Sequence, residues 1–443
     1  MTAHLTRISG WGDYPAHQVN CYPMERIDQI TACLAETKKL CVARGLGRGY
    51  GDVAIGEEIT LLLSGLNKVE SIDVDQGSVI AQGGCSLAQL IEVLRPHGLF
   101  PCVTPGTKYV TVAGMIAADV HGKNHHHDGS FGHYIDWIDL VDHTGVLRRL
   151  SQHSEQEWFR WTIGGMGLTG VIVRAQFRVR TVASGWICQR ARSADGLSEV
   201  MQALSSRRCP AYSVAWLDST ARGSAKGRAI IFEGWHAEAF EVSDGVVLFP
   251  SIQQQRVTVP RMPVSLVNQS TSKWFNAFYH WRGQSPKQSL VDWNQYFYPL
   301  DKLNSWYRLY GPQGFTQFQV VLPDGNAQEA ISELLDHLES ARMGSPLAVL
   351  KRMGKEGAGL SFPKPGYTLT LDIPVTQRTA GLLHDLIETS IRYGGRFYLA
   401  KDAYLTADQF HRSDPRASQF REYRKQVGLY RAFQSKLSRR LEL

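Results

Sequence analysis

The sequence lacks the simple markers of a membrane-spanning or secreted protein. Nowhere in its 443 residues does an apolar run approach the roughly 18 residues that a bilayer-spanning helix needs. The first residues, MTAHLTRISGWGDYPAHQ, contain neither a continuous apolar stretch nor a small-residue cleavage site, and a secretory signal requires both. We therefore expect a globular protein that stays in the cytoplasm, either soluble or peripheral to a membrane.

Markers of disulfides, zinc and nucleic-acid binding are also absent. The seven cysteines are odd in number and form no CxxC pair, which indicates reduced thiols. Histidines 125–127 are adjacent, whereas zinc ligands are usually spaced more widely, so we expect no metal. The net charge of +7 suits a phosphorylated substrate, an anionic membrane surface or nucleic acid. Because no basic stretch resembles a known nucleic-acid module, we expect no nucleic-acid partner.

The chain is long enough for two domains, since one hydrophobic core seldom organises this many residues. Early segments predict an α+β domain: residues 69–75 and 78–81 alternate as a hairpin. Ser86 and Gln89 form a capping box that opens a helix ending near Gly98.

The middle of the chain, from about Ser184 to residue 395, is rich in Trp, Tyr and Phe. Gln317 and Gln319 alternate with Phe318 and Val320, which places the two glutamines on one face of a strand. That face either lines a polar site or meets solvent, and the pattern alone leaves both interpretations open.

Three glycine-dense segments carry the chemistry, at residues 43–52, 105–124 and 164–170. Alternating glycines in the first segment let several backbone N–H groups point into one concavity, which suits a pyrophosphate. Small residues in the second allow a large planar ligand to approach. A Rossmann dinucleotide site is excluded, because no GxGxxG follows a strand and opens a helix near the N-terminus.

In their order along the chain these motifs resemble the decaprenylphosphoryl-β-D-ribose oxidase family. The motifs are ARGLGRGYGD, PGTKYVTVAGMIAADVHGKNHH, SFG, IGGMGLTG, QFQVVLP, FPKPGY, YLAKD and RRLEL. HGKNHH, the first glycine segment and AKD are the most specific, and the resemblance covers almost the whole chain.

The resemblance implies a two-domain α+β fold of the FAD-binding PCMH or vanillyl-alcohol-oxidase type. An FAD-binding domain would comprise residues 1–184 and a C-terminal return at 396–443, with an antiparallel-sheet substrate domain at 185–395. The implied reaction oxidises the C2 hydroxyl of a polyprenyl-phosphoryl ribose to the 2-keto sugar. A reductase of the short-chain dehydrogenase type would then complete epimerisation to the arabinose donor used for cell-envelope glycans.

The resemblance also assigns residues to the flavin and to the substrate. Expected FAD contacts are Gly45, Gly47, Arg48, Gly49, Tyr50, Gly106, Thr107, Thr111, Gly114, Ala117, Val120, His121, Gly122, Asn124, Ile172 and Tyr398. Expected substrate contacts are Lys123, Trp216, Gln317, Gln319, Lys351 and Lys401. Two positions depart from the family pattern: Thr370 stands where actinobacterial members have a cysteine, and Thr368 replaces an asparagine. A thiol at position 370 is therefore not required by this chain's chemistry.

Hydride transfer from an alcohol needs a proton acceptor near the hydroxyl and a positive charge near the flavin. Lys401, His121 and Lys123 are the catalytic candidates. Lys401 lies in FYLAKD, which predicts a short apolar strand.

Two alternatives remain open from the sequence. A soluble alditol or aldonolactone oxidase shares the fold, but several such enzymes bond the flavin to a histidine in the first glycine loop, where this chain has Arg48. We therefore expect non-covalent FAD. The second alternative is a non-catalytic flavin-binding protein, which the three intact glycine segments disfavour.

Overall fold

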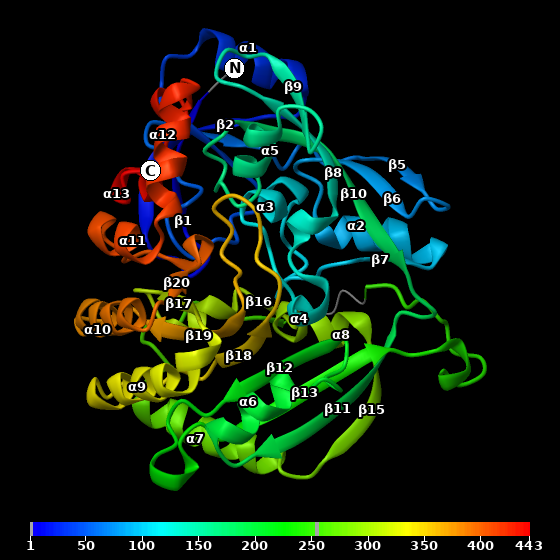
Figure 1. Cartoon of the computed structure of the whole chain (residues 1–443), viewed down its shortest axis with the longest axis vertical. Coiled ribbons are helices and arrows are strands. Elements are labelled where there is room, and N and C mark those ends of the chain that lie inside the picture. Colours follow the sequence, from blue (N-terminus) through cyan, green and yellow to red (C-terminus); the bar gives the residue numbers. More distant parts are fainter. Residues whose placement is uncertain (1–2, 253–256) are drawn as a thin grey trace.

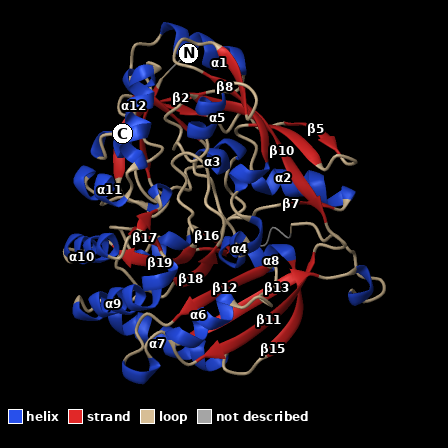
Figure 2. Cartoon of the chain, viewed as in Figure 1, coloured by secondary structure: helices blue, strands red, loops and turns tan. Residues whose placement is uncertain are grey.

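In the part of the chain that the structure describes, three larger β-sheets and one short strand pair are surrounded by helices (Figure 1, Figure 2). The computed structural model describes residues 3–252 and 257–443. Helices and antiparallel sheets coexist without a regular βαβ alternation, so the predicted α+β class is confirmed.

The first sheet lies near the N-terminus. Its strand order is β1 (His4–Ser9), β2 (Ala16–Pro23), β4 (Ile59–Leu62) and β3 (Cys41–Arg44), and α1 (Ile27–Glu36) links β2 to β3. The last helices of the chain are α11 (Ala407–Ser413), α12 (Arg416–Gln426) and α13 (Lys436–Arg440). The Cys41 N–H donates a hydrogen bond to the Ala432 carbonyl at 2.9 Å. The C-terminal segment therefore packs beside the N-terminal sheet (Figure 1).

The second sheet carries the two early motifs. Its order is β5 (Val69–Asp73), β6 (Ser78–Gln82), β10 (Val171–Thr181), β8 (Ile135–Val141) and β9 (Leu147–Ser151), with β7 (Leu99–Pro101) also pairing with β10. The predicted hairpin is β5–β6. The predicted capping box opens α2 (Leu87–Leu94), where the Gln89 N–H donates to Ser86 Oγ at 3.2 Å. Gly98 ends the following turn with φ 67°. Both predictions are confirmed.

Three short helices and one longer one occupy the connections of this sheet. They are α3 (Val112–Ala117), α4 (His125–Asp128) and α5 (Gln156–Thr162), together with α2. α3 lies within the second glycine segment, α4 directly follows that segment, and α5 leads into the third.

The third sheet is antiparallel and has eight strands. Its order is β15 (Lys287–Asp292), β11 (Trp186–Ala194), β13 (Ala229–His236), β12 (Tyr212–Leu217), β18 (Ala348–Met353), β19 (Gly366–Pro374), β17 (Phe315–Leu322) and β20 (Arg396–Phe397). A separate short pair joins β14 (Val257–Thr258) to β16 (Leu303–Asn304).

Helices cover both faces of the third sheet. α6 (Leu197–Ser205), α9 (Ala327–Ser340) and α10 (Thr379–Arg392) lie on one side, and α7 (Gln269–Arg282) and α8 (Trp293–Phe297) on the other. Tyr367 Oη donates to the Met201 carbonyl in α6, whereas Trp216 packs against Tyr279 in α7. Among the described residues, no helix combines the length and apolar character needed to cross a bilayer.

Candidate active site

The three glycine segments meet around α3. A Cβ atom at Gly45 would lie 2.3 Å from Thr111 Oγ1, so the first segment packs directly on the residue that caps this helix. The same hydroxyl accepts a hydrogen bond from the Gly114 N–H at 3.2 Å. At the far end of α3, the Gly164 N–H donates to the Ile116 carbonyl at 3.0 Å. Glycine segments that are distant in sequence thus form one wall.

The wall contains open space beside exposed glycine. A Cβ atom at Gly106 would meet no atom within 4 Å, and the φ of this residue lies outside the left-handed region. Gly51 is the opposite case, because a Cβ atom there would lie 1.7 Å from the Asp402 carbonyl oxygen. Packing explains glycine at position 51 but not at position 106. The exposed surface of Gly106 and Gly114 fits a large planar cofactor that approaches the backbone closely.

The first glycine loop is held by side chains at its rear. Gly47 adopts φ 63°, a conformation that favours glycine. The Arg48 guanidinium stacks 3.6 Å above the Trp11 ring, and its Nε donates to the Tyr109 carbonyl at 3.2 Å. A Cβ atom at Gly49 would lie 2.8 Å from the Val53 side chain. The loop is therefore fixed before any ligand binds.

The segment after α3 contains a buried acceptor. Asn124 Nδ2 donates to the Cys102 carbonyl at 2.7 Å and to Asp128 Oδ2 at 2.6 Å. Asn124 Oδ1 is buried and accepts no hydrogen bond from the described residues. A Cβ atom at Gly122 would lie 2.6 Å from this oxygen, so glycine is required there.

The other expected flavin residues lie at the edges of the same wall. The Val120 carbonyl accepts from the Phe131 N–H, and the Ala117 carbonyl accepts from the Met166 N–H. Ile172 is buried in β10. Thr107 Oγ1 donates to Asp301 Oδ1 at 2.8 Å, which ties the second glycine segment to the middle of the chain.

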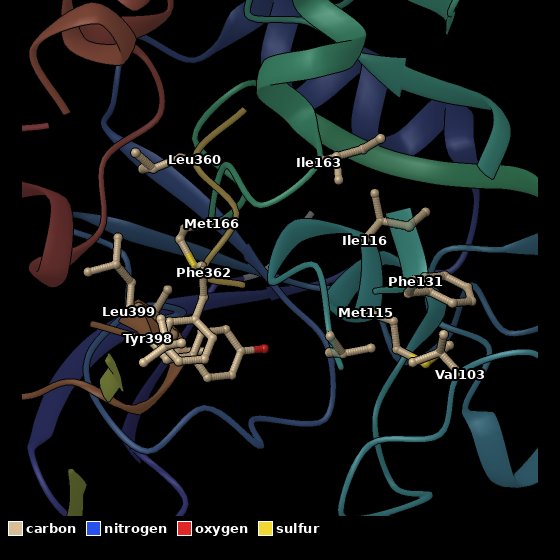
Figure 3. Packing of buried hydrophobic residues seen from close by; sticks show 14 of the residues in the cluster. Val103, Met115, Ile116, Phe131, Ile163, Met166, Leu360, Phe362, Tyr398 and Leu399 are labelled. Atoms are coloured by element: carbon tan, nitrogen blue, oxygen red, sulfur yellow. The ribbon is translucent and has the colours of Figure 1, made fainter. Parts of the chain in front are cut away.

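Two stacked rings flank the wall. Phe362 and Tyr398 have centroids 4.8 Å apart and planes inclined by 26° (Figure 3). The Tyr398 hydroxyl donates to the Ala118 carbonyl, at the end of α3, at 3.0 Å. His121 lies 5.5 Å from Tyr398 and 5.6 Å from Phe362, measured between ring centroids. These aromatic contacts connect the glycine wall to the third sheet.

The third sheet presents polar side chains on one face. Its register aligns Trp216, Val349, Thr370 and Gln319 in a single row. Because side chains alternate along strands, Lys351, Thr368, Gln317 and Asp372 share this face. The glutamines are buried, so their face does not meet bulk solvent, which decides between the two interpretations of the alternating pattern.

His121 joins this face to the glycine wall. Gln319 Nε2 lies 3.0 Å from His121 Nε2, and Lys351 Nζ lies 3.4 Å from His121 Nδ1. Burial, followed by the charge of Lys351, holds the pKa of His121 well below its usual value, so the ring is neutral. The Lys351 ammonium can only donate a hydrogen bond, so His121 Nδ1 accepts it. The proton of the neutral ring then sits on Nε2. The Gln319 amide must therefore present its oxygen to Nε2. The Thr368 hydroxyl lies 3.1 Å from the same amide and is the last group in this hydrogen-bonded series.

Lys401 lies over the Tyr50 ring and within the electrostatic reach of the buried Asp372 carboxyl group. Its Nζ sits 3.9 Å from the centroid of the Tyr50 ring. Burial, and then the charge of Lys351, lowers the pKa of Lys401 to about 7, while Asp372 opposes this shift. Burial raises the pKa of Asp372 to about 7, against the effects of Gln317 and Lys401. Asp372 Oδ1 accepts a hydrogen bond from Gln317 Nε2. The negative charge of Asp372 thus favours the protonated form of Lys401.

The local structure at Lys401 differs from the prediction. Only Arg396–Phe397 forms strand β20, and Leu399–Lys401 is a 3₁₀ turn. The Tyr50 N–H donates to the Ala400 carbonyl at 2.9 Å, which satisfies this turn from the first glycine loop rather than from a neighbouring strand. The strand predicted for FYLAKD is therefore wrong beyond Phe397.

Two expected substrate residues are directed toward other helices. Lys123 Nζ donates to the Tyr296 carbonyl of α8 at 2.5 Å. Burial, and then Lys351, lowers the pKa of Lys123 to about 7. Trp216 Nε1 donates to the Pro346 carbonyl at 3.0 Å, and its ring packs against Tyr279. These residues lie at the borders of the polar face, not at its centre.

The adjacent histidines have separate partners. The Gly354 N–H donates to His125 Nδ1, whereas the Nε2 atoms of His126 and His127 lie near the carbonyls of Pro210 and Cys209. Within residues 3–252 and 257–443, no group of three or more His, Cys, Asp or Glu side chains is arranged to hold a metal ion.

Comparison with known proteins explains this arrangement. Residues 15–151 match the FAD binding domain family. The chain is 32% identical to the decaprenylphosphoryl-beta-D-ribose oxidase of Mycolicibacterium smegmatis over 99% of this chain and 97% of that protein. This chain belongs to the decaprenylphosphoryl-β-D-ribose oxidase family. Its cofactor is accordingly FAD, and the chain is an FAD-dependent oxidoreductase with the predicted two-domain α+β fold of the FAD-binding PCMH type.

More distant relatives share parts of the chain. An uncharacterized protein of Streptomyces coelicolor is 29% identical over 81% of this chain and the whole of that protein. The D-arabinono-1,4-lactone oxidase of Saccharomyces cerevisiae is 27% identical over only 38% of this chain and 33% of that protein. Similarity to the ribose oxidase therefore extends through the polar sheet face, whereas similarity to the yeast lactone oxidase is confined to part of the chain.

Asp372 was not among the expected site residues. It follows Thr368 and Thr370 at two-residue spacing in β19, and its neighbours Leu371 and Ile373 face the other way. This alternation in the sequence could have identified Asp372, since a carboxylate within a largely apolar strand seldom lacks a partner.

Proposed function

We propose that this chain oxidises the C2 hydroxyl of a polyprenyl-phosphoryl ribose to the 2-keto sugar. The observation that carries the proposal is Lys351, which stands on the polar face of the third sheet with its Nζ 3.4 Å from His121 Nδ1. Burial lowers the pKa of Lys351 to about 8, as it lowers that of Lys401. Enclosed ammonium groups need an anionic partner, and the phosphoryl group of the substrate provides one. The identity to the M. smegmatis oxidase over 99% of the chain supports the same substrate class.

The reaction removes a hydride from C2 and a proton from its hydroxyl group. Bound FAD supplies the hydride acceptor. Lys401 takes the hydroxyl proton, because an amine with a pKa of about 7 is uncharged in a large fraction of molecules at neutral pH. Once protonated, Lys401 provides positive charge where negative charge accumulates. The negative charge of Asp372 favours this protonated form of Lys401.

The remaining polar residues hold the substrate. Gln317 and Gln319 bind sugar hydroxyls, and Lys351 binds the phosphoryl group. His121, whose two ring nitrogens face Lys351 and Gln319, positions both. Lys123 and Trp216 border the pocket. Thr370, which stands where the family has a cysteine, is buried across from Gln319.

We also propose the division into an FAD domain, residues 1–184 and 396–443, and a substrate domain, residues 185–395. Seven strands of the third sheet, which lie between Trp186 and Pro374, support these boundaries. β20 (Arg396–Phe397) is the exception, because it pairs with β17 across the second boundary.

FAD is held without a covalent bond in this proposal. Arg48 occupies the loop position at which several related oxidases attach the flavin through a histidine. Its guanidinium is already engaged with Trp11 and Tyr109. Acid precipitation should release all of the flavin into the supernatant, and colour that stays with the protein would contradict this assignment.

The 2-keto product requires a second enzyme. A reductase of the short-chain dehydrogenase type would return a hydride to the opposite face of C2 and give the arabinose donor. Because the substrate carries a polyprenyl chain, we place the protein in the cytoplasm, peripheral to the inner face of the membrane.

Isotope trapping tests the reaction. The holoenzyme is incubated with polyprenyl-phosphoryl ribose and an electron acceptor, quenched with sodium borodeuteride and hydrolysed. Mass spectrometry should find deuterium at C2 of a mixture of ribose and arabinose, and far less in a Lys401→Ala control quenched after the same time. Deuterium at another carbon, or none in either sample, would contradict the proposal. Turnover of free alditols or aldonolactones instead would favour the small-substrate oxidases.

A further inference from the structure

α7 has its polar side facing the protein and its aromatic side facing solvent. Ser272, Asn276 and His280 are buried. The exposed side carries four aromatic residues: Trp274 at 79% exposure, Phe275 at 46%, Phe278 at 46% and Trp281 at 66%. Positions 274, 278 and 281 follow helical spacing, so their side chains form one outward stripe. This orientation is the reverse of an ordinary surface helix.

The helix is fixed to the third sheet through its polar side. Asn276 Nδ2 donates to the Ser345 carbonyl at 3.3 Å, and Ser272 Oγ donates to the Gly344 carbonyl at 3.5 Å. The Tyr279 ring packs edge-on against Trp216 with centroids 4.6 Å apart. Asn268 caps the first turn by accepting from the Ser270 and Thr271 N–H groups. The outward stripe is therefore presented by an anchored helix.

Basic residues lie on α7 and beside it in the sequence. Lys273 and Arg282 lie on α7 itself, and Arg261 and Lys287 lie on either side of it in sequence. From Ser251 to Val291 the chain contains no Asp or Glu. An exposed aromatic stripe on a helix with Lys and Arg, in a stretch of sequence without Asp or Glu, matches the pattern of helices that lie in the interface of anionic bilayers.

The segment before α7 leads back to the proposed site. Val259 belongs to one apolar cluster with Tyr50 and Phe315, and Met262 and Val267 pack against that cluster. Tyr50 is the ring beneath Lys401. The chain thus runs from the active-site wall to α7, which lies at the end of the molecule farthest from α1 (Figure 1).

We propose that the outer stripe of α7 docks on the surface of an anionic lipid bilayer. The aromatic rings would enter the boundary between headgroups and acyl chains, and Lys273 and Arg282 would contact the headgroup phosphates. This inference rests on the proposed function in one respect: a docked α7 would place the substrate face next to the bilayer that holds the polyprenyl chain.

Vesicle binding of the FAD-loaded protein tests the proposal without turnover. Co-sedimentation is measured with phosphatidylcholine vesicles, with and without phosphatidylglycerol. We expect binding that requires phosphatidylglycerol and weakens with salt. Combined Trp274→Ser, Phe278→Ser and Trp281→Ser should lower the partition coefficient about tenfold or more, while FAD content and oxidation of a short-chain substrate in solution stay normal.

Phe240→Ser provides the matched control, because Phe240 is 87% exposed and lies outside α7. Its vesicle binding should equal that of the wild type, and an equal loss in both variants would overturn the assignment to α7. Sedimentation velocity without lipid tests whether a second copy of this chain covers the stripe instead. If the wild type forms a dimer and the triple variant does not, the bilayer proposal is overturned. Vesicle binding by a protein that oxidises no phosphoryl sugar would contradict the proposed function alone.

Discussion

The two walls of the candidate site differ in what they are made of. The glycine wall, or flavin wall, is built from backbone. Its loops pack so closely that a Cβ atom added at Gly45 would lie only 2.3 Å from the Thr111 hydroxyl. The polar face of the third sheet, or substrate wall, is built from side chains, and Lys401 joins them from the 3₁₀ turn after β20. It encloses Lys351, Lys401 and Asp372, all with pKa values displaced toward neutrality by burial.

The difference separates binding from chemistry. A backbone wall recognises the shape of a cofactor, and it needs no charge to do so. A wall of enclosed ionisable groups reduces stability until an anionic ligand arrives, a cost commonly accepted at functional sites. We therefore expect substitutions in the flavin wall to change FAD content, and substitutions in the sheet face to change rates and substrate affinity.

The largest effect is expected at Lys401. Lys401→Met should keep FAD but slow anaerobic flavin reduction at saturating substrate by on the order of a hundredfold or more, because proton acceptor and charge are both lost. Lys401→Arg should rescue poorly, since guanidinium stays protonated and is wider. Lys355→Met is the control, because Lys355 is exposed. Its flavin should be reduced at the wild-type rate. Near-normal reduction in Lys401→Met would leave His121 and Lys123 as the candidates.

Gly106→Val tests the flavin wall. No protein atom lies within 4 Å of the added Cβ, so the fold should persist while the side chain fills space needed by the cofactor. FAD affinity should fall by roughly tenfold or more, measured by absorbance after dialysis. Gly381 in α10 is equally unobstructed, and Gly381→Val should keep its flavin. Full retention of FAD in Gly106→Val would remove position 106 from the wall.

Lys351→Ala should separate affinity from rate. Loss of the phosphate partner is expected to raise KM by roughly tenfold or more, with FAD content unchanged and the limiting rate reduced far less than in Lys401→Met. Steady-state kinetics on the phosphoryl sugar measure both constants. Flavin loss in Lys351→Ala would mean that the residue supports the cofactor wall instead.

The smallest effect concerns stability and pH. The folded pKa of Lys351, about 8, lies below its ordinary value of 10.5, so between these values the unfolded chain binds more protons. The buried charge of Lys351 therefore lowers the free energy of unfolding most below pH 8. This destabilisation decreases as pH rises toward 10.5. Lys351→Met should raise the melting temperature at pH 7 by a few degrees and much less at pH 10. An equal shift at both pH values would contradict the buried-charge account.

The sequence could predict local structure where local chemistry decides it. The capping box of Ser86 and Gln89 and the β5–β6 hairpin formed as expected, because their hydrogen bonds join near neighbours. Lys401 is a different case: FYLAKD looks like a strand, but Tyr50, far away in sequence, bonds the Ala400 carbonyl and the segment turns.

Long-range placement limited the rest of the prediction. Asp372 joins the site only through the register between β17 and β19, which places it opposite Gln317. The helical spacing in α7 is visible in the sequence, but periodicity alone cannot tell which stripe faces inward. Buried Asn276 and exposed Trp274 reverse the usual assignment.

Anaerobic rapid mixing with a panel of substrates tests the central claim most directly. The holoenzyme is mixed with polyprenyl-phosphoryl ribose, polyprenyl-phosphoryl arabinose, free ribitol and an aldonolactone, and flavin bleaching is followed at saturating concentrations. If the enclosed lysines serve a phosphoryl substrate, the polyprenyl-phosphoryl ribose should bleach the flavin rapidly, while the free alditol and lactone should leave it oxidised. Rapid bleaching by ribitol or the lactone, with none by the phosphoryl ribose, would contradict the account.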